Sequence, residues 1–407
     1  MSAAGTALAV GNINFAAPAQ AAIPRGGAIP GTGTIYPRSE YEKRQKRVLE
    51  AVERAGLDGI MVTAGSHLRY LTGYSGEGAY FAPFPLILSP GHAPTLLVRR
   101  FDEANVRVNS CIDDIVPFFH EPEWGAVCRD AFQRHGLHNK RVGLELGCWG
   151  LAPNDLAALQ AALPDLKIAD ATKVVATVSA VKDELELKAV REAAALTDVA
   201  IAAFQKSLRV GVTESEVEAA INRAVVAAGG EPISGTNLTF GERLKLPHQA
   251  PGNFPIRMNE GAFIELSGTK NDYVGPLCRS AVVGRNPGLE SLYAISSDAL
   301  DAGIAIMKPG TTTGAINAAI RGVVERSPHP HALRARTGYS IGVNWLDRGN
   351  FSIEPEGKDV LDVNMTFHLP ILLFDENGYE TGCSETVLIT ERGPEILGKS
   401  PRAMYRA

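Results

Sequence analysis

The stretch "IELSGTKNDYVGPLCRSAVVG", residues 264–284, has the pattern of two β-strands joined by a turn. Ile264 and Leu266 alternate with other residues ahead of the polar segment "SGTKND", and Val282 and Val283 lie in the apolar run that ends the stretch. Alternation with a period of two is typical of a strand with one buried face, and the residues of "SGTKND" favour a turn. The sequence therefore predicts a β-hairpin.

The composition is that of an ordinary globular protein. The chain has 407 residues, of which 45% are hydrophobic and 21% are charged, so we expect two domains with full-sized cores. The formal net charge of −5 is small and both signs are interspersed, so we expect neither a nucleic acid nor a membrane surface as a partner. No run approaches the roughly twenty apolar residues of a membrane helix.

Residues 1–37 are rich in Ala, Gly and Pro and show no helical or strand periodicity. Pro18, Pro24 and Pro30 break any long element, which predicts an extended arm. No basic segment followed by an unbroken apolar run precedes Asn12, so the sequence disfavours export. Five dispersed cysteines without a C-x-x-C pair are typical of reduced thiols, and we expect a cytoplasmic protein.

The pattern becomes regular after the arm and indicates two further domains. Residues 38–171 alternate helical and strand patterns, which predicts a small α/β domain. Residues 172–407 form the second domain, which begins with apolar residues at three- and four-residue steps over 174–208 and therefore with one long helix. Thr213 and Glu216 have the spacing of a capping box at the start of the next helix.

Several motifs occur in a fixed order along the chain: "H … E-L-S-G … R-S … M-K-P-G … G-Y-S-I-G … M-T-F-H … S-E-T-V-L-I-T-E". In this order the chain resembles the creatinase and aminopeptidase P family over about residues 38–398. The resemblance implies an α+β protein in which a small N-terminal α/β domain of the creatinase type precedes a C-terminal catalytic domain with the pita-bread fold. It also implies a homodimer.

The resemblance identifies the positions in this chain that correspond to the metal ligands of the family. The five metal ligands of the family match this chain at Glu265, Pro276, Tyr339, Pro370 and Ser384. Only the Glu265 carboxylate binds a hard metal ion well, and a shift of one residue to Glu385 still leaves too few ligands for a paired site. The resemblance therefore implies a metal-free branch that needs no cofactor. A metal-dependent enzyme similar to Xaa-Pro peptidases is an alternative.

His248, in "KLPHQAPGN", lies seventeen residues before Glu265 and matches the acid/base histidine of metal-free creatinase. Imidazole suits this role because its unperturbed pKa of about 6.5 lets it take and return a proton near neutral pH. Alternatively, His248 only caps a turn. Glu265 would supply a buried carboxylate for a cationic substrate, or else form an inter-strand ion pair.

The motifs "FIELSG … LCRS … GYSIG … NMTFH … SETVLITE" are most similar to those of ectoine hydrolases, metal-free relatives that open a cyclic amidine. Creatine is a poor substrate candidate, because Cys278 and Pro370 stand where creatinase has carboxylates. We therefore expect a metal-independent hydrolase of a C–N bond in a small cyclic amidine or related amino-acid derivative. The alternatives are a lyase or isomerase that uses His248 as its base, and a binding protein without catalytic activity.

Further residues are candidates for the site. His368 and Tyr339 would contribute to catalysis from strands that border the pocket, although each is equally consistent with a satisfied core residue. Arg279, or Arg99 or Arg100, would pair with a substrate carboxylate.

The loop "YLTGYSGEGAYFAPFP" contains Tyr74, Tyr80 and Phe81, which could stack on a flat cation. Equally, they could belong to the core of the small domain. Glu385 is a further candidate for substrate binding.

Overall fold

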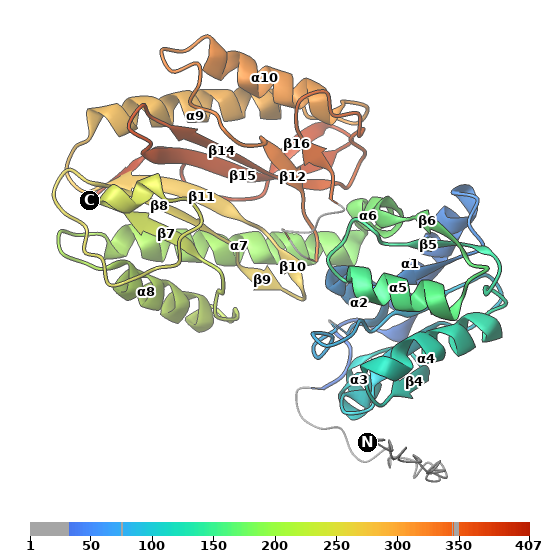
Figure 1. Ribbon diagram of the computed structural model, residues 1–407. Coiled ribbons are helices and arrows are strands. Elements are labelled where there is room, and N and C mark those ends of the chain that lie inside the picture. Colours follow the sequence, from blue (N-terminus) through green and yellow to red (C-terminus); the bar gives the residue numbers. More distant parts are fainter. Residues whose placement is uncertain (1–31, 75, 344, 346–349) are drawn as a thin grey trace, which may run out of the picture.

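The computed structural model describes residues 32–407 except 75, 344 and 346–349. Most of the expected arm, residues 1–37, therefore lies outside the described residues. The chain forms two domains, and the α+β arrangement expected from the sequence is confirmed (Figure 1). Within the described residues, no helix is both long enough and apolar enough to cross a lipid bilayer.

The first domain is built on a six-stranded sheet with the order β4-β3-β2-β1-β5-β6. Its strands are β1 (Gly59–Val62), β2 (Leu86–Leu88), β3 (Thr95–Arg99), β4 (Asp114–Phe118), β5 (Arg141–Leu144) and β6 (Lys167–Asp170). Its helices are α1 (Arg38–Arg54), α2 (Gly65–Thr72), α3 (Glu103–Asn109), α4 (Glu121–Arg134), α5 (Pro153–Ala162) and α6 (Thr172–Ala180). Parallel pairs join β3 to β4, β1 to β5 and β5 to β6, as expected of an α/β domain.

The connection between the domains differs from the prediction. One long helix over 174–208 is wrong, because the chain forms two helices, α6 and α7 (Glu184–Ser207). Asp183 accepts a hydrogen bond from the backbone N–H of Glu186 at 3.0 Å, and the Glu186 carboxylate accepts one from the backbone N–H of Asp183 at 2.8 Å. This capping box starts a new helix, and Val181 is in an extended conformation before it.

The second domain places two sheets between two pairs of helices (Figure 1). The first sheet has the order β17-β11-β8-β7 and packs on α7 and α8, and the second has the order β13-β12-β14-β15-β16 and packs on α9 and α10. The helices are α8 (Glu214–Ala227), α9 (Pro287–Ala305), α10 (Thr313–Glu325) and the short 3₁₀ helix η1 (Gly241–Lys245). The strands are β7 (Asn237–Phe240), β8 (Gly261–Leu266), β9 (Thr269–Lys270), β10 (Tyr273–Val274), β11 (Leu277–Val282), β12 (Gly338–Ser340), β13 (Ser352–Ile353), β14 (Thr366–Phe374), β15 (Glu380–Thr390), β16 (Gly393–Ile396) and β17 (Tyr405–Arg406).

The predicted hairpin is confirmed as the antiparallel pair β8 and β11, with Glu265 opposite Cys278. A smaller hairpin of β9 and β10 lies between them. Asn271 and Asp272 form its turn with φ angles of 48° and 73°. Positive φ at both central residues is typical of a type I′ turn, and Asn and Asp adopt it more readily than other residues with a Cβ. The capping box of Thr213 and Glu216 is also confirmed.

Candidate active site

A cavity of about 670 Å³ opens in the second domain and collects side chains from both sheets. Glu265 reaches it from β8, and Tyr339 and Glu380 reach it from β12 and β15. His248 lines it from the loop that follows η1. The structure therefore brings together three of the four residues that the sequence proposes as catalytic, and adds one carboxylate.

The His248 loop is anchored at both ends by one buried carboxylate. Glu214, the first residue of α8, accepts hydrogen bonds from the backbone N–H groups of Phe240 and Gly252, both at 2.9 Å. It also accepts one from Arg243 Nε at 3.0 Å. Because these residues flank the loop on either side, Glu214 fixes the position from which His248 reaches the cavity.

The backbone of His248 has a φ of 60°, in the left-handed region. For a residue with a Cβ this conformation costs about 1–2 kcal/mol, because the Cβ approaches the following carbonyl oxygen. Such conformations cluster at active sites, where the surrounding structure holds them in place. The strain at His248 is therefore consistent with a functional role.

Glu265 is almost fully buried beside His248. Burial raises the pKa of its carboxyl, while the Cys278 thiol, the charge of His248 and the Asn237 amide act in the opposite direction. The opposing effects show that donors and a titratable base surround this carboxyl. A carboxylate at this position can pair with a cationic group in the cavity.

Tyr339 connects the cavity to a buried series of hydrogen bonds. Its hydroxyl shares a hydrogen bond of 3.0 Å with His368 Nδ1, and His368 Nε2 shares one of 2.8 Å with Ser384 Oγ. Burial, with the charges of Arg279 and Arg336, lowers the pKa of His368 to about 3, so its ring is neutral at physiological pH. His368 therefore does not line the cavity itself but is hydrogen-bonded to Tyr339, which does.

Comparisons with known proteins identify the family. Residues 188–391 match Metallopeptidase family M24, and residues 44–181 match Creatinase/Prolidase N-terminal domain. The chain belongs to the M24 family. The resemblance expected from the motifs is confirmed at this level.

Two relatives match the M24 chain over almost their whole length. An uncharacterized hydrolase/peptidase of Sinorhizobium fredii is 28% identical over 387 residues, which cover 91% of this chain and 97% of the relative. The ectoine hydrolase of Halomonas elongata is 27% identical over 399 residues, which cover 91% and 98%. The chain is thus similar to members of a family of hydrolases and peptidases.

Solved structures confirm the pita-bread fold. Dipeptidase PepE from Mycobacterium ulcerans superposes with a TM-score of 0.81 at 22% identity, over 91% of this chain and 99% of that one. The prolidase from Pyrococcus horikoshii gives a TM-score of 0.76 at 20% identity, over 89% and 99%. At these identities the likeness establishes the fold alone.

The residues that occupy the expected M24 metal positions do not fit a pair of metal ions. Pro370 lies opposite Ser384 on the ladder of β14 and β15, and the Ser384 hydroxyl is engaged by His368. The neighbouring Glu385 cannot substitute, because its carboxylate accepts a hydrogen bond from Arg279 Nη2 at 3.0 Å. A paired site needs several carboxylate or imidazole ligands, which these positions lack.

One group of three donors remains at this place. Ligand atoms of Glu265, Cys278 and His368 lie within 4.8 Å of one another. Both nitrogens of His368 already share hydrogen bonds, with Tyr339 and Ser384, and burial raises the pKa of the Cys278 thiol well above its usual range. A metal ion here would have to break these bonds and displace the thiol proton. These three residues therefore do not fit a metal ion in the arrangement that they have here.

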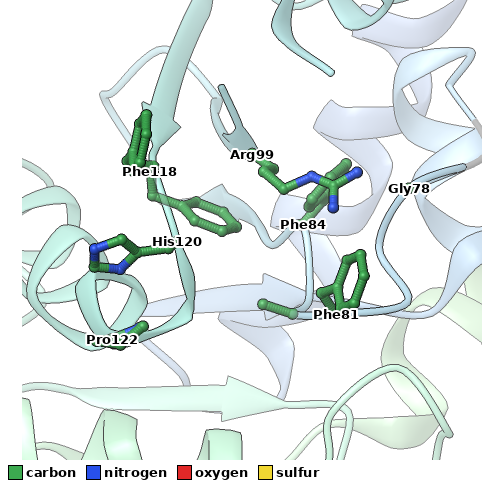
Figure 2. Close-up of a pocket in the computed structure, with 9 residues that line it drawn as sticks. Gly78, Phe81, Phe84, Arg99, Phe118, His120 and Pro122 are labelled. Atoms are coloured by element: carbon green, nitrogen blue, oxygen red, sulfur yellow. The ribbon is translucent and has the colours of Figure 1, made fainter. Parts of the chain in front are cut away.

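The loop aromatics Tyr74, Tyr80 and Phe81 lie in the first domain and do not line the cavity. Tyr80 and Phe81 are 76% and 58% exposed, and the guanidinium carbon of Arg99 lies 5.4 Å and 5.0 Å from their ring centroids. Tyr74 is buried, and its hydroxyl donates to the backbone carbonyl of Glu77. Phe81 and Arg99 line a separate pocket of about 290 Å³ (Figure 2). The cation on which these rings stack here is the protein's own arginine.

Arg279 and Glu385 also lie outside the cavity lining. Both side chains are almost fully buried, and they pair with each other. Arg279 also donates to the carbonyl oxygens of Ser384 and Ser400, at 2.6 Å and 2.9 Å. These contacts join β11 and β15 to the C-terminal segment, so the pair stabilises the fold at the place where the two sheets meet.

Sequence reasoning missed four charged residues of the cavity, Lys245, Arg334, Arg336 and Glu380. Glu380 is 2% exposed, and burial together with the charge of Glu265 raises the pKa of its carboxyl to about 8. The guanidinium carbon of Arg336 lies 4.2 Å from the centroid of the Tyr339 ring. The even spacing between Glu380 and Ser384 on one strand was the available signal, because residues four apart in a strand share a face.

Proposed function

We propose that this chain is a metal-independent hydrolase of a C–N bond in a small cyclic amidine or related amino-acid derivative such as ectoine. The observation that carries the proposal is the cavity that brings His248 and Glu265 together while Pro370 and Ser384 occupy positions expected for metal ligands. The similarity to the ectoine hydrolase of Halomonas elongata supports the substrate class.

The geometry suggests separate roles for Glu265, His248 and Arg336 in the proposed reaction. The Glu265 carboxylate pairs with the amidinium of the substrate and holds its carbon toward His248. His248 takes a proton from water, the water oxygen attacks that carbon, and the same proton is then returned to the departing nitrogen. One C–O bond forms and one C–N bond breaks, so the product gains one molecule of water. Arg336, at the cavity wall, pairs with a substrate carboxylate.

A peptidase that cleaves Xaa-Pro bonds is the second candidate. Its support is the match to a metallopeptidase family and the superposition on a dipeptidase and a prolidase. This candidate needs a metal site, whereas the proposed hydrolase does not.

A single experiment distinguishes the two candidate functions. Purified protein is treated with a chelator, incubated separately with ectoine, hydroxyectoine, creatine and short Xaa-Pro peptides, and examined by mass spectrometry. We expect the mass gain of one water molecule on a cyclic amidine without added metal. Cleavage of Xaa-Pro peptides that appears only when manganese or zinc is added would overturn the proposal.

The role of His248 is tested by His248→Ala. Because only proton transfer is removed, we expect kcat to fall about 10²- to 10⁴-fold with little change in KM. Glu265→Gln keeps the shape but removes the charge, so it should raise KM as well as lower kcat. His331→Ala, at an exposed histidine outside the cavity lining, is the control and should leave both constants unchanged. Wild-type turnover in His248→Ala would assign the base to another residue.

We further propose that the protein acts as a homodimer. Tyr80, Phe81 and Phe101 are exposed aromatic side chains gathered around Arg99 on the first domain. Aromatic residues and arginine are enriched in protein interfaces. Sedimentation at micromolar concentration checks this, and a fully active monomer would contradict it.

A further inference from the structure

Glu380 is a buried carboxylate that the described residues leave unpaired. Both of its oxygens are inaccessible and have no hydrogen-bond partner among the described residues. Other buried glutamates behave differently: Glu214 accepts three hydrogen bonds, and Glu385 pairs with Arg279. Because an unsatisfied buried carboxylate is costly, Glu380 requires an explanation beyond folding.

The position of Glu380 points to a ligand. Glu380 and Glu265 line the same cavity, and the charge of Glu265 raises the pKa of the Glu380 carboxyl. The two carboxyl groups therefore place negative charge on the wall of one cavity. A group carrying positive charge between them would satisfy both.

The neighbouring cations do not take this role. Lys245 lines the cavity, but its ammonium group donates to Glu242 at 2.8 Å and lies 4.3 Å from the centroid of the Tyr379 ring. The Arg336 guanidinium lies over the Tyr339 ring. Arg334 also lines the cavity, and its guanidinium carbon lies 4.8 Å from the centroid of the Phe374 ring. Among the described residues, no ion pair involves Glu380. A bound cationic group would supply the charge that the described residues do not place beside Glu380.

We propose that Glu380 and Glu265 together form a subsite for a planar cationic group, an amidinium, and that Glu380 determines specificity for the cation over a neutral amide. The inference rests on the proposed function, whose substrate class it narrows. An amidinium presents N–H donors on two nitrogens, so each carboxylate can accept from one of them. A neutral amide of the same shape offers only one donor nitrogen and no charge, and therefore leaves Glu380 without its cation.

The test uses the wild-type chain with acetamidinium and acetamide as probes, in titration calorimetry at pH 7. We expect acetamidinium to bind at least about 10-fold more tightly than acetamide, since a charge-assisted pair is stronger than a neutral one. Because the cation favours the charged form of Glu380, binding should release a proton, which is measured by comparing buffers with different ionisation enthalpies. Glu380→Gln should lose this preference and the proton release while it binds acetamide as before.

Two control variants are compared with Glu380→Gln. Glu385→Gln makes the same change at an equally buried glutamate on the same strand, outside the cavity, and should bind acetamidinium as the wild type does. If its lost pairing with Arg279 prevents folding, Glu376→Gln, at an exposed residue between β14 and β15, takes its place.

Two results would overturn the subsite. One is equal acetamidinium binding by the wild type and by Glu380→Gln, and the other is no acetamidinium binding by folded wild-type protein. The proposed function fails separately, when no cyclic amidine is hydrolysed although the acetamidinium preference depends on Glu380. If Glu380→Gln instead hydrolyses an amidine with the kcat and KM of the wild type, the proposed subsite is wrong and the proposed function stands.

Discussion

Glu380 and Glu385 lie on the same strand, β15, and each is 2% exposed, yet their surroundings are opposite. Because side chains alternate along a strand, two residues five positions apart face opposite sides. Glu380 faces the cavity and has no partner among the described residues, whereas Glu385 Oε1 lies 3.0 Å from Arg279 Nη2 and 3.4 Å from Arg402 Nε.

The difference shows that two equally buried carboxylates can differ in whether the fold pairs them. Burial raises the pKa of both groups, to about 8 for Glu380 and to about 7 for Glu385. At Glu380 the charge of Glu265 adds to this effect, while at Glu385 the two arginines act against it. Equal burial therefore has unequal consequences, because only one of the two charges is matched inside the fold.

The largest expected effect comes from removing the arginine partner of Glu385, so that this carboxylate is buried without a strong ion pair. Arg279→Met removes the buried partner of Glu385 and leaves the carbonyls of Ser384 and Ser400 without their donor. We expect the free energy of unfolding to fall by about 3–5 kcal/mol, because breaking a buried pair leaves an uncompensated charge. Urea denaturation at pH 8 measures this.

The double variant Arg279→Met/Glu385→Leu distinguishes charge from packing. Removing both partners also removes the unpaired charge, so a part of the lost stability should return, although the two carbonyls stay unsatisfied. A single variant within about 0.5 kcal/mol of the wild type would contradict the structural role of the pair.

A second effect, of similar size, is the pH dependence that Glu380 confers on stability. Its carboxyl has a pKa near 4.3 in an unfolded chain and about 8 in the folded protein. Between these values the folded state holds a proton that the unfolded state does not, so stability falls as pH rises, by up to about 1.4 kcal/mol per pH unit. Glu380→Gln should lack this dependence and become increasingly more stable than the wild type up to about pH 8.

The measurement is chemical denaturation of both proteins at pH 5, 6.5, 8 and 9. The other titratable or charged groups of the cavity are common to both proteins, so the difference between the two curves isolates Glu380. These groups are Lys245, His248, Glu265, Arg334, Arg336 and Tyr339. Parallel curves over this range would show that the carboxyl is not perturbed as the structure indicates.

Local sequence patterns predict much of this fold. The hairpin of 264–284 follows from alternation and turn residues, and both are properties of neighbouring positions. The one long helix was wrong because apolar periodicity continues across Asp183, while the capping box with Glu186 ends one helix and begins another. The three-residue spacing of Asp183 and Glu186 is the sequence signal for the start of a new helix.

The site could be predicted only in part, for a physical reason. His248, Glu265 and Tyr339 were found through motifs and line one cavity. Glu380 has no motif, because what distinguishes it is that no described residue pairs with it in three dimensions. The partner of Arg279 is likewise a tertiary property, since Glu385 is 106 positions away along the chain.

The smallest expected effect concerns the second arginine beside Glu385. The Arg402 side chain is 26% exposed, its Nε lies 3.4 Å from Glu385, and its Nη1 lies 2.5 Å from Asp301. Because water screens its charge and Glu385 keeps Arg279, Arg402→Met should lower the free energy of unfolding by no more than about 1 kcal/mol. Urea denaturation at low and high salt measures this, and added salt should reduce the already small difference from the wild type. A loss as large as that of Arg279→Met would mean that the exposed arginine, and not the buried one, holds Glu385 in its charged form.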